Sequence, residues 1–296
     1  MGKNDRFQII YTQGITDITR ILLDTRTGVL YLQTVSGYAG GLTPLLDSEG
    51  RMDNEIFDII RTLKDMGIMF AAASGRQLMS LKRKFEPVAD DIIYIAENGG
   101  YAVKDDEEIY VNSMDRNVVE DILDTAGEIE DVSLFLCGKK YSYTDVPELA
   151  EIMRKPVFGY EIKCVDDLKN VDDDIFKIGL FDTVDPRERS LKLMKPRFEG
   201  KVHMTLSGYN SLDFLNIDVN KGVALKNVMD RFGISKDETV AFGDNFNDIE
   251  MFDAVGHSYA MLNADEYVRS RAKNVIGTND DNSVIKTIKA IIEEIS

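Results

Sequence analysis

A run of carboxylates and amides follows the short apolar segment that ends at Phe242. Asp244 and Asp248, with Asn247 beside them, come directly after this predicted strand and open a helix. Carboxylate and amide oxygens at the carboxyl end of a strand suit a hard cation such as Mg²⁺, which takes oxygen ligands and keeps some of its waters. A helix cap would explain one such residue but not the whole run. The segment therefore predicts a magnesium site with Asp244 and Asp248 as ligands.

Two further segments carry groups that suit a phosphate. Ser74 and Gly75 follow another predicted strand, and a serine hydroxyl together with helix N-terminal amides can cradle a phosphate. Lys221 stands just before a predicted helix, where its ammonium could place a positive charge on a phosphate oxygen. Each motif also has a plainer interpretation: Ser74 as an ordinary helix N-cap, and Lys221 as a solvated surface side chain.

An Asn-Gly pair is the fourth motif. Asn98 and Gly99 follow the apolar run Ile92 to Ala96. Such a pair is typical of a tight turn. The same turn could also present the Asn98 side chain to a substrate, and both interpretations stay open at this point.

The elements that carry these residues alternate between strands and helices from about residue 50 onward. Continuous apolar runs predict buried strands, and apolar residues at helical spacing predict the helices between them. The predicted strands are Ile68 to Ala73, Ile92 to Ala96 and Thr239 to Phe242. Repeated strand–helix units imply a parallel sheet covered by helices, with the ligand at the carboxyl ends of the strands.

Two parts of the chain depart from this α/β pattern. Residues 114–209 are irregular and rich in charge, and they are predicted to form an α+β insertion. Residues 1–47 hold three strand-like runs separated by turns, which predicts a small β-rich module that must lean on something else. The predicted division is a module at 1–47, a core at 48–113 and 210–296, and an inserted unit at 114–209.

The composition excludes several classes of partner. The chain has 296 residues, with 35 Lys and Arg against 52 Asp and Glu, and a formal net charge of -17. Nucleic acid and anionic membranes need a basic surface, so neither is expected as the main partner. Cys137 and Cys164 are too few for a disulfide framework and are expected to be buried thiols. Without a signal-peptide pattern or a membrane-length apolar run, the protein is expected in the cytoplasm.

The four motifs together resemble those of the haloacid-dehalogenase-like hydrolases, and most of all the Cof-type sugar-phosphate phosphatases. The matching residues are Ser74, Gly75, Asn98, Lys221, Asp244, Asn247 and Asp248. By this resemblance Ser74 and Gly75 bind the phosphate, Asn98 and Asn247 face the substrate, and Lys221 is catalytic. The acidic pair holds Mg²⁺. The resemblance also implies a Rossmann-like core, a cap at 114–209 and a small phosphorylated metabolite as substrate.

The first motif of that family is missing. In the family a strand ends in Asp-x-Asp-Gly-Thr, where the first Asp attacks phosphorus and the second acts as general acid and base. Counting back from the following Leu-Leu-Asp-Ser segment, these positions hold Gly40 and Leu42, and neither side chain can do this chemistry. Asp24 also ends an apolar run, but Arg26 then holds the second position, so Asp24 is interpreted as a turn residue. Residues 1–47 instead resemble a separate family of small uncharacterised bacterial proteins.

Two kinds of function follow from this combination. One is a Mg²⁺-dependent phosphomonoester hydrolase of Cof type whose activity is impaired by the missing nucleophile, since such a loss costs on the order of 10⁶ in kcat. The other is a non-catalytic phosphate- or metabolite-binding protein, or an inactive fusion product, on the same scaffold. The feature that discriminates between them is a pair of carboxylates on the central strand.

Overall fold

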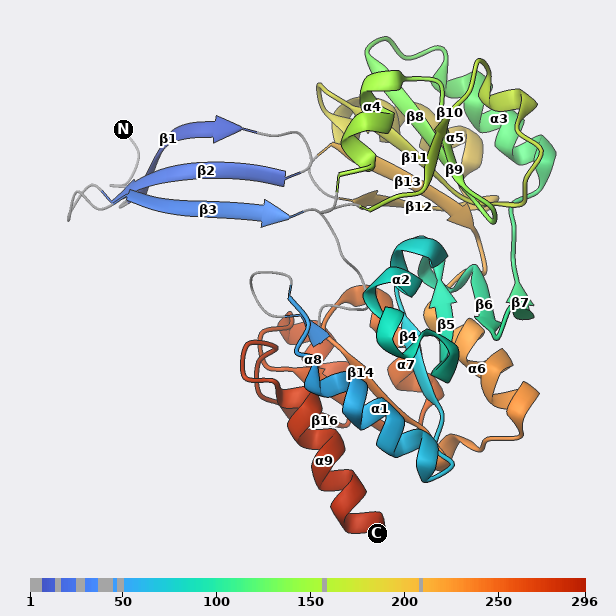
Figure 1. The fold of residues 1–296 in the computed structure, drawn as a ribbon. Helices are drawn as coiled ribbons and strands as arrows, with labels where there is room; N and C mark the ends of the chain where they lie inside the picture. Colours follow the sequence, from blue (N-terminus) through green and yellow to red (C-terminus); the bar gives the residue numbers. More distant parts are fainter. Residues whose placement is uncertain are drawn as a thin grey trace.

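The protein folds into an α/β core, a second unit built on a six-stranded sheet, and a three-stranded N-terminal sheet. These are seen in a computed structural model that describes residues 7–13, 17–24, 30–36, 45–46, 51–155, 159–207 and 210–296. Figure 1 shows the second unit above the core, and the chain passes between them twice. No helix in these described ranges is both long and apolar enough to cross a membrane.

The N-terminal strands form an antiparallel sheet with the order β1-β2-β3. Their bounds are Phe7–Gln13 for β1, Asp17–Asp24 for β2 and Leu30–Ser36 for β3. Asp24 ends the middle strand, opposite Phe7, and Leu23 pairs with both Gln8 and Leu30. The predicted β-rich character of this segment is confirmed. Asp24 belongs to this sheet, which Figure 1 shows in blue, apart from the α/β core.

The strands of the core form two sheets in the part of the chain that the structure describes. One has the order β4-β5-β6-β7, and the other β14-β15-β16. The pairs β4–β5, β14–β15 and β15–β16 are parallel, whereas β6 and β7 add an antiparallel hairpin. The strands are β4 (Phe70–Ala73), β5 (Ile92–Ala96), β6 (Tyr101–Lys104), β7 (Glu107–Val111), β14 (Val240–Gly243), β15 (His257–Met261) and β16 (Asn274–Ile276).

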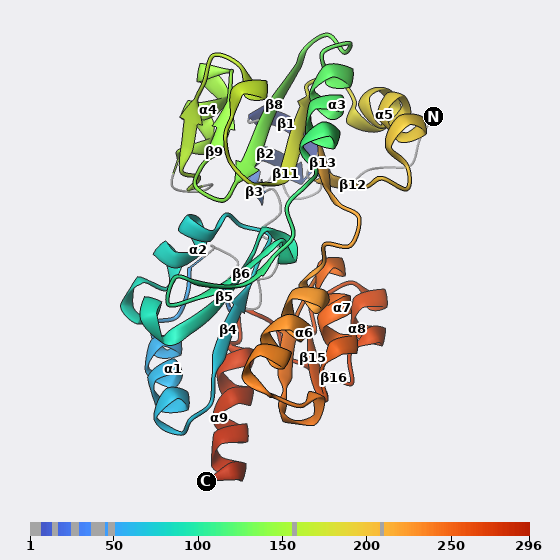
Figure 2. The same ribbon diagram turned by 90° about the vertical axis from the view of Figure 1, so that its right-hand side faces the viewer.

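Helices cover both faces of these two sheets and hold them in one layered body (Figure 2). The helices are α1 (Glu55–Asp65), α2 (Leu78–Lys84), α6 (Lys221–Phe232), α7 (Ile249–Ala254), α8 (Glu266–Arg271) and α9 (Ser283–Ile295). One apolar core joins α1 and α9 to β4, β5 and Met261 of β15. A second joins α6 and α7 to Ile93 and Ile95 of β5 and to β14 and β15. The Rossmann-like core predicted from the alternating pattern is confirmed.

The second unit is built on a six-stranded sheet with the order β10-β9-β8-β11-β13-β12. Its strands are β8 (Val132–Gly138), β9 (Ser142–Thr144), β10 (Ile162–Cys164), β11 (Ile175–Asp182), β12 (Val202–Ser207) and β13 (Ser211–Asn216). The helices α3 (Arg116–Ala126) and α5 (Leu191–Phe198) pack on one face, and α4 (Pro147–Met153) packs on part of the other. Cys137 lies buried in β8, but Cys164 is exposed on the edge strand β10, so only one of the two predicted buried thiols is buried.

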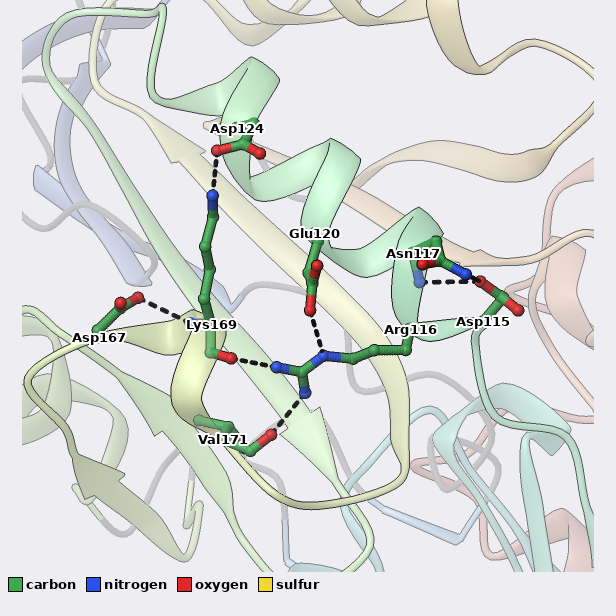
Figure 3. Close-up of polar contacts among 8 residues, drawn as sticks. All are labelled: Asp115, Arg116, Asn117, Glu120, Asp124, Asp167, Lys169 and Val171. Atoms are coloured by element: carbon green, nitrogen blue, oxygen red, sulfur yellow. Dashed lines mark hydrogen bonds and ion pairs between the residues drawn. The ribbon is translucent and has the colours of Figure 1, made fainter.

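Polar contacts attach α3 to the rest of this unit (Figure 3). The guanidinium of Arg116 donates to the carbonyls of Val171, at 2.6 Å, and of Lys169. The side chain of Lys169 in turn forms an ion pair with Asp124 of α3. At its N-terminus the helix is capped by Asp115, whose carboxylate accepts from the Asn117 amide at 2.8 Å. These contacts supplement the apolar face that α3 buries against the sheet.

Candidate functional site

Strand β14 leads into a loop that is organised around the Asp248 carboxylate. Oδ2 of Asp248 accepts from the backbone amides of Asp244, at 2.9 Å, and of Asn245, at 3.0 Å. Oδ1 accepts from Nζ of Lys221 at 2.7 Å, and both of these side chains are completely buried. All three donors are supplied by the chain itself. Asp248 therefore shapes the loop and neutralises Lys221, and its predicted role as a metal ligand stays a prediction.

Lys221 is the first residue of α6 and is not a solvated surface lysine. The preceding residue, Asn220, caps the helix by accepting from the amide of Val223 at 2.8 Å. This cap fixes the start of the helix and directs the Lys221 ammonium toward Asp248. A fully buried ammonium is tolerated only where a carboxylate balances its charge. The sequence motif thus places a fixed positive charge beside the β14 loop.

Two other oxygens of the loop have no hydrogen-bond partner among the residues that the structure describes. Oδ1 of Asp244 and Oδ1 of Asn247 are both buried, and neither accepts a hydrogen bond from the described part of the chain. Burial, and next the charge of Asp248, raise the pKa of Asp244 to about 7. Buried acceptors left without partners are costly unless something else satisfies them. A carboxylate and an amide oxygen are ligands that Mg²⁺ accepts, so these two atoms fit a magnesium site.

The Asn98 side chain links this loop to the end of β4. Its Oδ1 accepts from Nδ2 of Asn247 at 2.9 Å, and its backbone amide donates to the carbonyl of Ser74 at 3.0 Å. Gly75 lies directly against the same side chain, because a Cβ added there would stand 2.6 Å from Oδ1 of Asn98. The carboxyl ends of β4, β5 and β14 therefore meet at one place, as expected for ligands in an open α/β sheet.

Ser74 is buried at this meeting point. Its hydroxyl accepts from the backbone amide of Arg76 at 3.1 Å, which is the turn geometry that an ordinary cap would have. The amide of Ser74 continues the parallel ladder by donating to the carbonyl of Ile95 at 2.8 Å. Ser74 thus makes the hydrogen bond of an ordinary cap and also lies beside Asn98 at the meeting point of the strands, and its phosphate-binding role stays a prediction.

Glu97 is a buried charged residue of the site region that the sequence motifs did not single out. It is 1 % exposed, and its carboxylate lies 3.8 Å from Nζ of Lys177 on β11. Burial raises the pKa of Glu97 to about 7, although Lys177 lowers it. Only its position directly before the Asn-Gly turn could have signalled it, since a glutamate in a turn is normally solvated.

Three residues discussed for the first motif are not among the described residues of the site. Gly40 and Leu42, which occupy the positions of the missing carboxylates, fall outside the described residues. Asp24 ends β2 in the N-terminal sheet. Within the described ranges, no cluster of three or more His, Cys, Asp or Glu side chains could hold a metal ion. The site thus combines one open carboxylate with the amide oxygen of Asn247.

Comparison with known proteins agrees with this fold and this arrangement of residues. The chain belongs to the haloacid dehalogenase-like hydrolase family, whose model matches residues 44–288. A family of unknown function matches residues 6–52, which confirms that the N-terminal segment resembles a separate family. The two matches overlap at the Leu-Leu-Asp segment, where the resemblances found in the sequence also meet.

Individual relatives are phosphatases of small molecules. The 5-amino-6-(5-phospho-D-ribitylamino)uracil phosphatase YbjI of Escherichia coli is 29% identical over 236 residues, covering 78% of this chain and 86% of that protein. The HMP-PP phosphatase of an Enterobacter species is 25% identical over 224 residues, covering 74% of this chain and 81% of that protein. A crystal structure from Eubacterium rectale has a TM-score of 0.76 and 29% identity, covering 81% of this chain and 92% of that one.

Proposed function

We propose that the protein binds the phosphate of a small phosphorylated metabolite together with Mg²⁺, and that it hydrolyses phosphomonoesters only slowly. The observation that carries this proposal is the chain of contacts from Ser74 through Asn98 and Asn247 to the β14 loop. These contacts bring a hydroxyl, an ammonium and unpartnered oxygens to the carboxyl ends of three strands. The relatives named above, which act on phosphorylated small molecules, support the same class of ligand.

In this proposal the residues have separate tasks. Asp244 and Asn247 hold Mg²⁺ through their unpartnered oxygens, and Asp248 keeps the loop and Lys221 in place. Bound Mg²⁺ would supply positive charge that stabilises the charge developing on the phosphate oxygens. Ser74 and the amides after β4 orient the phosphate, and Lys221 contributes a fixed charge beside it. Residues 114–209 act as a cap, and residues 48–113 with 210–296 form the core.

The missing first motif limits the expected rate. Without a carboxylate at position 40, the covalent route through an aspartyl-phosphate lacks its usual nucleophile. Loss of a covalent nucleophile costs on the order of 10⁶ in kcat in a well-studied hydrolase, or roughly 8 kcal/mol of barrier. A protein that binds phosphate without turning it over is the second candidate. It is favoured by the small donor set, since one open carboxylate and one amide oxygen hold Mg²⁺ but supply no nucleophile.

The test is hydrolysis of p-nitrophenyl phosphate with and without Mg²⁺, together with calorimetric titration of inorganic phosphate. We expect Mg²⁺-dependent phosphate binding in the unmodified chain and its loss in Asp244→Asn. Asp253→Asn is the matched control, because Asp253 is an exposed residue that pairs with Arg271. Binding without turnover selects the non-catalytic candidate. Turnover that is lost in Asp24→Asn would show instead that Asp24 serves as the nucleophile, and absence of phosphate binding would overturn the proposal.

A further inference from the structure

The turn that follows β5 touches every part of the candidate site. Asn98 contacts both Ser74 after β4 and Asn247 in the β14 loop. The next residue, Gly99, lies against the start of α6, since a Cβ added there would stand 2.3 Å from the carbonyl oxygen of Asn220. The turn is therefore packed between Ser74, the β14 loop and the start of α6. A small displacement of the turn would change the positions of all three.

The same turn also touches the six-stranded sheet of the second unit. A Cβ added at Gly100 would stand 3.4 Å from Phe176 on β11, and Tyr101 stacks on the Phe176 ring at 5.3 Å between centroids. Glu97 and Lys177 form the buried ion pair across this junction. Two more exposed ion pairs join the two units in the described residues, Arg83–Glu161 at 2.7 Å and Lys139–Glu108. The turn after β5 thus connects β11 of the second unit to the candidate site through direct contacts.

The backbone of the turn is held in an unfavourable conformation. Glu97 and Asn98 have φ values of +49° and +55°, and Gly99 has +98°. The left-handed region is unremarkable for glycine and tolerable for asparagine, but it is costly for a glutamate. Such strain persists only where surrounding contacts over-determine it, and it concentrates at functional positions. The contacts that hold Glu97 there are two backbone hydrogen bonds, to the carbonyl of Arg76 at 3.1 Å and from the amide of Gly100 at 3.0 Å, and the ion pair of its buried side chain with Lys177.

The Glu97 carboxylate is incompletely satisfied by its neighbours. Neither oxygen accepts a hydrogen bond from a nitrogen or oxygen donor in the described residues. The groups that face it are the ammonium of Lys177, the carboxylate of Asp213 and the weakly donating thiol of Cys137. An ion pair at 3.8 Å without hydrogen bonds gains little stability against its desolvation cost. Stability alone therefore does not account for the pair.

We propose that Glu97 is a positioning residue. Its ion pair with Lys177 holds the Asn98 side chain against Asn247. The geometry of the proposed phosphate and Mg²⁺ site therefore depends on how β11 packs against the core. The inference rests on the proposed function for its ligand. Removal of either charge releases the strained turn, moves Asn98 and leaves Asn247 without its acceptor. The effect reaches the site through Asn98 and requires no contact between Glu97 and the ligand.

The experiment compares Glu97→Gln, Lys177→Met and the double variant with the unmodified chain. Inorganic phosphate is titrated calorimetrically in excess Mg²⁺ at about pH 8, above the pKa of Glu97, which burial raises to about 7. Each single variant is expected to weaken phosphate binding about tenfold, within the range that coupled residues produce. The double variant is expected to be no weaker than the weaker single one, because both substitutions break the same pair. The double variant also removes both charges of the buried pair together. It therefore separates loss of the pair from misfolding caused by a single buried charge left without its partner.

Arg83→Met and Glu161→Gln are the matched controls. They remove an exposed ion pair between the same two units that involves no residue of the turn, and should change phosphate affinity less than about twofold. Unchanged affinity in both Glu97→Gln and Lys177→Met would overturn the proposal. Fully additive losses in the double variant would do so as well.

A second measurement separates this inference from the proposed function. The side-chain amide signals of Asn98 and Asn247 are followed by NMR in Lys177→Met without any ligand. Both signals are expected to shift in this variant and to stay in place in Arg83→Met. If the unmodified chain does not bind phosphate, the proposed function fails, but this measurement still decides the inference. Unmoved Asn98 and Asn247 signals in Lys177→Met would show that the pair does not position the turn.

Discussion

At the scale of single residues, the two carboxylates of the β14 loop have different environments although they stand four positions apart. Asp248 receives an ammonium and two amides, whereas Asp244 keeps an unpartnered oxygen and lies near the charge of Asp248. Hydrogen bonds and an opposite charge stabilise an ionised carboxylate, and burial beside a like charge destabilises one. Asp248 therefore supports the loop, and Asp244 is the carboxylate available to a ligand.

This difference gives opposite outcomes for two similar substitutions. Asp248→Asn should lower the free energy of unfolding by about 3 kcal/mol, because it leaves the Lys221 ammonium buried without its counter-charge. Asp244→Asn should not lower it in the absence of metal, because it removes a like charge near Asp248. Urea unfolding of both variants in EDTA measures this. Equal destabilisation by the two substitutions would contradict the assignment of separate roles.

The sequence predicted the polar residues of the site but not their partners. Ser74, Asn98, Lys221 and Asp244 could be found because each follows or precedes a recognisable apolar element. Glu97 could not, since its ion partner is 80 positions away, on a strand of the second unit. Spacing within one segment carries no information about such a pair. Which of the two loop aspartates is open to a ligand likewise depends on tertiary contacts with Lys221.

At the scale of elements, the turn after β5 is the connection least tolerant of change. Gly99 has a φ of +98°, and an added Cβ would stand 2.3 Å from a backbone oxygen that cannot rotate away. Gly99→Ala should therefore lower the free energy of unfolding by about 3 kcal/mol or more, since strain and a backbone clash add. Gly67 is the control, because it has a φ of +77° with nothing within 4 Å, and Gly67→Ala should cost only about 1 to 2 kcal/mol. Urea denaturation of both variants compares them, and equal costs would refute the packing argument.

Continuous apolar runs predicted some parallel strands of the core, whereas other strands were missed. The runs placed β4, β5 and β14 close to their observed bounds. The strands β9 and β10 have three residues each, and no alternation can be recognised over so short a length. The β6–β7 hairpin was also missed, because its turn uses Asp105 and Asp106, both with positive φ, in place of an Asn-Gly signal.

At the scale of the whole molecule, the described strands of the core form two separate ladders, at the place where the first motif of the family would be expected to contribute a strand. In the described residues, β4 pairs with β5 alone and β14 pairs with β15 alone. β4 is parallel to β5 and β14 is parallel to β15, and the carboxyl ends of β4 and β14 lead into the candidate site. The helices on the two faces span both halves, so the layers stay together without a continuous ladder. The missing first motif thus bears on both the expected chemistry of the site and the expected pairing of β4 and β14.

Hydrogen exchange tests this division directly. A strand paired on one side leaves part of its amides without acceptors, and such amides exchange through smaller openings than those of a strand paired on both sides. Phe70, Ala71 and Ala73 of β4 are only partly buried, and Val240 of β14 is 37 % exposed, whereas β5 is buried throughout. Amides of β4 and β14 should thus exchange faster than those of β5 and of β11, which is paired on both sides. Equal protection in all four strands would show that another segment completes the sheet between β4 and β14, and the site would then include whatever side chains that segment brings.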